Sequence, residues 1–187
     1  LVSSAYIFYI IKKYYGWKDV GFGKLNFKSL IWFLPYVLIL IPMGFKLVQS
    51  IYENLGSFSY ETWLTIIITL VGTSLAGFSE EVIFRGMILN SFKSDKSIIG
   101  AMIISSIGFS FVALAIKLNN IWPVVIFHVI WNFILMASSL IGVEVSKVSL
   151  LCNPLNIIMG VILWTIIIRD QRKKNKLKYS FNKVIKW

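Results

Sequence analysis

Long runs of apolar residues, separated by short polar connectors, constrain this chain more than any other feature of its sequence. Most of the runs have the length that an α-helix needs to cross the hydrocarbon core of a bilayer. Hydrophobic residues make up 57% of the 187 positions and charged residues only 14%, which excludes an ordinary soluble domain. Because backbone polar groups must be paired within lipid, we predict an all-α, polytopic transmembrane helical bundle of about six helices. After a short apolar helix at Leu1–Ile11, the predicted crossings are Leu30–Val48, Thr62–Phe78 (continuing to Ser91), Ile98–Ile116, Ile121–Ile141 and Leu150–Ile168.

The formal charge of +11 is concentrated beside the apolar runs. Lysines crowd the connector between Lys12 and Lys28, and from Arg169 onward all charged residues are basic except Asp170. This placement is typical of topology signals and lipid headgroup contacts, so we expect membrane lipid and no nucleic acid as a partner. We divide the chain into a helical membrane domain, 1–168, and a basic cytoplasmic tail, 169–187. High usage of Ile, Lys and Asn indicates a low-GC bacterium, and hence a multi-pass protein of the bacterial cytoplasmic membrane with its tail inside.

The number of predicted crossings does not allow both basic segments to lie on the same side of the membrane. If the lysine-rich connector is cytoplasmic, five further crossings place the basic tail on the opposite side of the membrane, against its charge. Either one segment is re-entrant or the chain lacks one crossing. A missing crossing within Ile98–Ile116 would return the tail to the cytoplasm.

Two adjacent glutamates end the apolar run that begins at Thr62. Ionisable groups inside a membrane segment are costly, so they indicate a functional site. In a helix, Glu81 and Arg85 lie four residues apart on one face, acid before base, which is the favourable order for an ion pair. Glu80 points elsewhere, and we therefore expect it to be the carboxylate that is free for chemistry.

The only histidine, His128, shares a helical face with Asn132. A histidine in a membrane helix can be a structural residue bonded to a carbonyl, and that interpretation stays open beside a functional one. With Glu80, these residues would supply an acid or base, a second acid or base or a metal ligand, and an amide donor for an oxyanion. Such a set suits the attack of water on an amide bond. The sequence contains no His-Glu-x-x-His motif, no Gly-x-Ser-x-Gly elbow and no phosphate-binding glycine loop.

Two motifs resemble those of the CPBP family of intramembrane proteases, also called the CAAX-protease and bacteriocin-processing or ABI family. Glu80-Glu81-x-x-x-Arg85-Gly86, with Phe84 before the arginine, is similar to the first motif of that family. Ile121-Trp122-Pro123, leading to His128-x-x-x-Asn132, is similar to the third. Together the matching region extends from about Leu75 to Phe133.

The resemblance implies an all-helical membrane core with an active site in a cavity open toward the cytoplasm. In that site Glu80 would activate water and Glu81 would pair with Arg85. His128 would bind metal or polarise the intermediate, and Asn132 would help to hold the oxyanion. The resemblance leaves open whether a divalent metal such as zinc takes part or the glutamate works alone. It implies a peptide or membrane-protein substrate or partner.

The second motif of the family, Phe-x-x-x-His, is not present in this chain. Read in place, Phe109–Ala113 puts Ala113 where that histidine belongs. In an alternative alignment, Ala101–Ile107 resembles the start of the second-motif helix and Gly108–Asn120 resembles the stretch before the third motif. A segment with one crossing would then be missing between Ile107 and Gly108. We predict an intramembrane endopeptidase that uses glutamate-activated water; the alternative is an inactive family member acting as a bacteriocin self-immunity or membrane regulatory or scaffold protein.

Overall fold

The computed structural model describes residues 2–84, 109–145, 154–155, 157–170 and 172–173, and their regular structure is entirely helical. Residues 157–170 form a helix that follows the elements named below. The predicted all-α membrane bundle is confirmed, because three helical segments of the described residues, 27–53, 60–84 and 122–140, are long and apolar enough to cross a membrane. The named elements are α1 (Val2–Tyr14), the 3-10 helix η1 (Phe27–Phe33), α2 (Leu34–Glu53), α3 (Tyr60–Glu81), α6 (Phe109–Leu118) and α7 (Trp122–Leu140).

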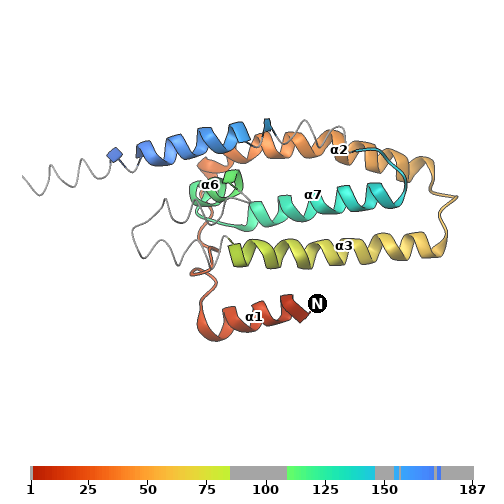
Figure 1. The fold of residues 1–187 in the computed structure, drawn as a ribbon, viewed down its shortest axis with the longest axis horizontal. Helices are drawn as coiled ribbons and strands as arrows, with labels where there is room; N and C mark the ends of the chain where they lie inside the picture. The colour runs from red at the N-terminus through yellow and green to blue at the C-terminus, as the bar shows by residue number, and fades with distance from the viewer. Residues whose placement is uncertain (1, 85–108, 146–153, 156, 171, 174–187) are drawn as a thin grey trace, which may run out of the picture.

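Helix α7 lies at the centre of the bundle. It runs between α2 and α3 and packs against both, and α1 lies on the other side of α3 (Figure 1). Helix α6 packs against η1 and α7. Because α7 contacts most of the other helices, its position depends on almost every part of the described fold.

Local sequence signals set the helix starts. Ser59 caps α3, since its hydroxyl accepts a hydrogen bond from the amide of Thr62 at 3.2 Å. Pro123 lies in the first turn of α7, as predicted, where its missing amide removes no helical hydrogen bond. Pro35 lies inside the span, as predicted, and the structure places it in the first turn of α2, directly after η1.

Several connections meet at one end of the bundle, which we call the basic end. There the first connector (residues 15–26) contacts the turn between α6 and α7: the amide of Asn26 donates to the carbonyl of Leu118 at 3.1 Å. Lys117 of that same region forms an ion pair with Asp170 at 3.1 Å, which brings the C-terminal helix to this end as well. The described bases gathered here are Lys12, Lys13, Lys18, Lys24, Lys28, Lys117, Arg169, Arg172 and Lys173 (Figure 1).

The predicted crossing Ile98–Ile116 lies mostly outside the described residues. Its described part belongs to helix α6, which lies at the basic end, where α3 also ends (Figure 1). The first connector and Asp170 lie at this same end of the bundle. The proposed gap between Ile107 and Gly108 lies outside the described residues.

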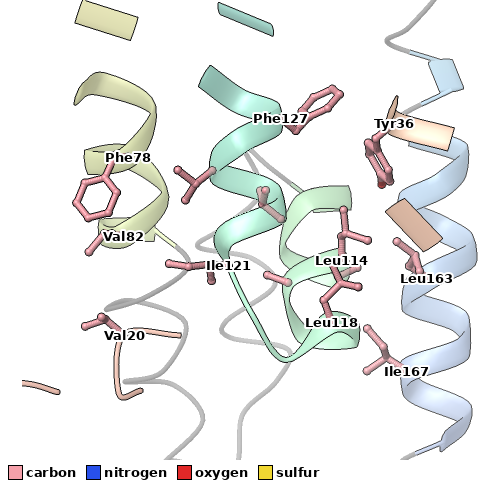
Figure 2. Packing of buried hydrophobic residues seen from close by; sticks show 14 of the residues in the cluster. Val20, Tyr36, Phe78, Val82, Leu114, Leu118, Ile121, Phe127, Leu163 and Ile167 are labelled. Atoms are coloured by element: carbon pink, nitrogen blue, oxygen red, sulfur yellow. The ribbon is translucent and has the colours of Figure 1, made fainter. Parts of the chain in front are cut away.

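The hydrophobic core has two clusters along α7. The larger one lies toward the basic end and joins the first connector, α1, α2, α3, α6, α7 and the C-terminal helix (Figure 2). The smaller one lies toward the opposite end, where α2 and α7 meet. Fully or almost fully buried members of the larger cluster include Val20, Tyr36, Val82, Leu114, Leu118, Ile121, Phe127 and Leu163. The larger cluster therefore lies at the end of the bundle that holds the glutamates.

Candidate active site

Helices α3 and α7 approach each other closely at Gly77. A Cβ atom on Gly77 would lie 2.9 Å from Cγ2 of Val129 and 3.3 Å from its backbone nitrogen. Membrane helices come together in this way where a small residue lies at the contact. Glu81 follows one turn later on the same face of α3, which places it at the level of His128, the neighbour of Val129.

His128 lies between the two glutamates. Its Nδ1 is 2.6 Å from Oε1 of Glu81, a short hydrogen bond, and its Nε2 is 3.7 Å from Oε2 of Glu80. We assign the proton of the short contact to Nδ1, with the carboxylate oxygen of Glu81 as the acceptor. Glu81 thus fixes the orientation of the imidazole and turns its Nε2 toward Glu80.

The exposed fraction increases from Glu81 to His128 to Glu80. Glu81 is 0% exposed, His128 is 20% exposed and Glu80 is 52% exposed. The distance of 3.7 Å between His128 and Glu80 is too long for a direct hydrogen bond, and a polar separation of this size is commonly bridged by water. Glu81 therefore has the surroundings of a positioning group, and Glu80 those of a group that meets water and substrate.

The other two predicted residues stand apart from this contact. Asn132 lies one turn after His128 in α7 and is partly buried. Its side chain makes no hydrogen bond to any of the residues that the structure describes, so its amide is available as a donor. Arg85, and with it the predicted pair between Glu81 and Arg85, lies outside the described residues.

The short contact between Glu81 and His128 was not predicted from the sequence. We expected Glu81 to pair with Arg85 and His128 to accompany Glu80. A signal for the contact exists in Gly77, which lies four residues before Glu81 and permits the close approach to α7. Gly72 in the same helix offered the same possibility, and a single sequence does not show which helix each of the two glycines faces.

The described side chains do not fit a metal centre. Among residues 2–84, 109–145 and the described part of 154–173, no group of three or more His, Cys, Asp or Glu side chains is arranged to hold a metal ion. His128 uses Nδ1 for Glu81, so only Nε2 and the carboxylate of Glu80 face each other. Catalytic zinc sites usually have three protein ligands, and we therefore derive no step that passes through a metal.

Fold and site together define a class: a multi-pass helical membrane protein in which one histidine joins two glutamates near one end of the bundle. The family model described as Type II CAAX prenyl endopeptidase Rce1-like matches residues 62–115. This match includes both glutamates but ends before His128 and Asn132, and it is consistent with the resemblance to the CPBP family. No curated protein and no solved structure matches the chain.

The close approach at Gly77 leads to a prediction about stability. Gly77→Ala adds a methyl group against the backbone of Val129, so the helices must separate, and we expect a loss of about 1–3 kcal/mol in the free energy of unfolding. Gly72→Ala, in the same helix, is the matched control, because no atom lies within 4 Å of its added Cβ. Thermal unfolding in detergent measures both variants. Equal unfolding temperatures would show that α3 and α7 are not in contact at Gly77.

Proposed function

We propose that this protein is an intramembrane endopeptidase that hydrolyses peptide bonds with water activated by Glu80. The observation that carries the proposal is the pairing of an exposed carboxylate with an imidazole whose other nitrogen is held by a buried carboxylate. This arrangement supplies a base that meets solvent and a second acceptor with a fixed direction. The match to a CAAX prenyl endopeptidase family over residues 62–115 supports the same reaction class.

In the proposed reaction, one water molecule lies between Glu80 and Nε2 of His128. Both groups accept its protons, so its oxygen lone pair faces the carbonyl carbon of the substrate. As the new C–O bond forms, Glu80 takes a proton from the water, and the carbonyl oxygen becomes an oxyanion. Asn132 is the candidate donor to that oxyanion. Glu80 then gives the proton to the leaving nitrogen, and the C–N bond breaks, which yields a carboxylic acid and an amine; the remaining proton of the acid then passes to the amine, which leaves a carboxylate and an ammonium group.

The charge distribution supports one orientation of the protein in the membrane. Among the described residues, the basic end has nine Lys and Arg residues against four acids, Asp19, Glu80, Glu81 and Asp170, while Lys46 and the acids Glu53, Glu61 and Glu144 lie toward the opposite end. By the positive-inside rule we place the basic end, and the tail 169–187, in the cytoplasm of a bacterial cell. The site then lies near the cytoplasmic surface, where it would meet peptides or membrane-protein segments among the lipid headgroups.

One observation favours an alternative. Ala113 is fully buried in α6, which packs against η1 and α7, and α7 separates α6 from α3 (Figures 1 and 2). No second imidazole therefore approaches Glu80 from α6. A catalytically silent relative that acts in bacteriocin self-immunity or as a membrane regulator or scaffold would tolerate the absence of the second-motif histidine.

A double substitution at the site tests the proposal. We expect the purified chain in lipid to release new amino termini from a peptide library, and Glu80→Gln with His128→Gln to abolish that release without a change in helix content. Equal cleavage by both proteins would end the protease interpretation. If cells carrying the double variant survive bacteriocin challenge as well as cells with the wild type, and the wild type cleaves nothing, the self-immunity alternative holds.

A further inference from the structure

Asn120, in the turn between α6 and α7, binds two other parts of the fold at once. Its Oδ1 accepts a hydrogen bond from the amide of Trp122 at 2.7 Å, and its Nδ2 donates to the carbonyl of Gly23 at 2.5 Å. Its backbone amide donates to the carbonyl of Ala115 in α6 at 3.3 Å. The side chain is largely buried, with 7% of the residue exposed. The start of α7, the first connector and α6 are thus tied together by one residue.

The bond to Trp122 fixes the first turn of α7. A helix leaves its first amides without partners, and Pro123 has no amide to contribute. Ile121, which precedes the helix, has no side chain that could cap it. Asn120 therefore supplies the side-chain acceptor at this helix start.

The hydrogen bond to Gly23 holds the backbone of the first connector in close contact with this turn. A Cβ atom on Gly23 would lie 2.8 Å from the carbonyl oxygen of Asn119. Gly21, two residues earlier, has a φ of +93° and accepts a hydrogen bond from the amide of Ile121 at 3.1 Å. Neither glycine leaves room for a side chain, so the connector and the turn form a closely fitted joint.

This joint sets the rotation of the helix that holds His128. His128 lies six residues after Trp122, about 9 Å along the axis of α7. A rotation or a small shift of the first turn moves the imidazole away from Oε1 of Glu81, where the contact is only 2.6 Å long. The direction of Nε2 toward Glu80 would be lost with it.

We propose that Asn120 is a positioning residue of the active site, which acts by locking α7 to the first connector so that His128 stays bonded to Glu81. The kinetic part of this inference rests on the proposed hydrolase function. The structural part, the state of the His128 ring, does not depend on any activity.

The lone histidine makes a direct test possible, because the imidazole nitrogen signals in an NMR spectrum of the detergent-solubilised chain belong to His128 alone. Asn120→Asp keeps the size of the side chain and the acceptor for Trp122 but loses the donor to Gly23; Asn120→Ala loses both bonds. We expect both variants to change the wild-type Nδ1–H signal into a mixture of the two tautomers, and kcat to fall by on the order of tenfold to 100-fold.

Asn54→Ala is the matched control, because it removes an asparagine hydrogen bond to the carbonyl of Ser50 at the opposite end of the bundle. It should leave the histidine signal unchanged. If Asn120→Asp and Asn120→Ala lower the unfolding temperature but keep the wild-type histidine signal, Asn120 is only structural and the inference fails. If the wild type cleaves no peptide but the histidine signal changes as expected, the positioning role stands and the proposed hydrolase function fails.

Discussion

The Glu80→Gln variant is expected to cleave peptides about 10²–10⁴-fold more slowly than the wild type, with little change in KM. Glutamine keeps the shape of the side chain, but it cannot take a proton from water. Since Glu80 is 52% exposed and lies 3.7 Å from Nε2 of His128, few contacts of the folded state depend on its charge. Initial rates over a range of peptide concentrations, with unfolding temperature measured in parallel, give both quantities.

Glu53→Gln is the control for this measurement. Glu53 is also an exposed glutamate near a helix end, but it lies at the opposite end of the bundle, where it accepts a hydrogen bond from Gln49 at 2.8 Å. We expect its rate to equal that of the wild type. If Glu80→Gln retained full activity and Glu81→Gln lost it, the base would be Glu81, and the assignment of roles would be reversed.

Removal of the Glu81 side chain should mainly affect the folded state. Glu81 is fully buried, and Glu81→Ala leaves Nδ1 of His128 without its acceptor; a lost hydrogen bond to a charged group costs about 1.5–3 kcal/mol. Glu80→Ala, the same substitution one residue earlier at an exposed position, should change the free energy of unfolding by no more than about 0.5 kcal/mol. Reversible unfolding of both variants in detergent measures the difference.

A double-mutant cycle isolates the contact itself. The free energies of unfolding of Glu81→Ala, His128→Ala and the double variant should differ from additivity, because the two side chains are in direct contact. Glu80→Ala combined with His128→Ala should be close to additive, since their separation is longer and solvent reaches Glu80. Additive effects in the first cycle would contradict the bond between Glu81 and His128.

The main helices could be predicted from the sequence because apolar length alone decides them. The apolar runs around Pro35, Thr62 and Pro123 correspond to helices α2, α3 and α7, whose bounds lie within a few residues of the predicted ones. The predicted crossing over Ile98–Ile116 stays a prediction, because most of it lies outside the described residues. Hydropathy measures length and polarity, and it contains no information on which connectors meet.

The site was predicted as a set of residues but not as a set of contacts. An intramembrane Glu pair and a lone His are costly enough to attract attention without any structure. The partner of each group depends on how α3 and α7 face each other, and that is decided by the small residue Gly77 and by the turn at Asn120. Asn120 itself carried no signal in the sequence, because an asparagine in a connector is ordinary turn chemistry.

The joint between the first connector and the start of α7 also has a consequence for biosynthesis. The hydrogen bond from Asn120 to Gly23 joins residues that are 97 positions apart, whereas Glu81 and His128 are 47 apart. Chains are made from the amino terminus, and contacts between distant residues are slow to form. Both glutamates are therefore synthesised before Asn120 and His128 exist, so a newly made chain passes through a stage in which it has both carboxylates but not the contact with His128.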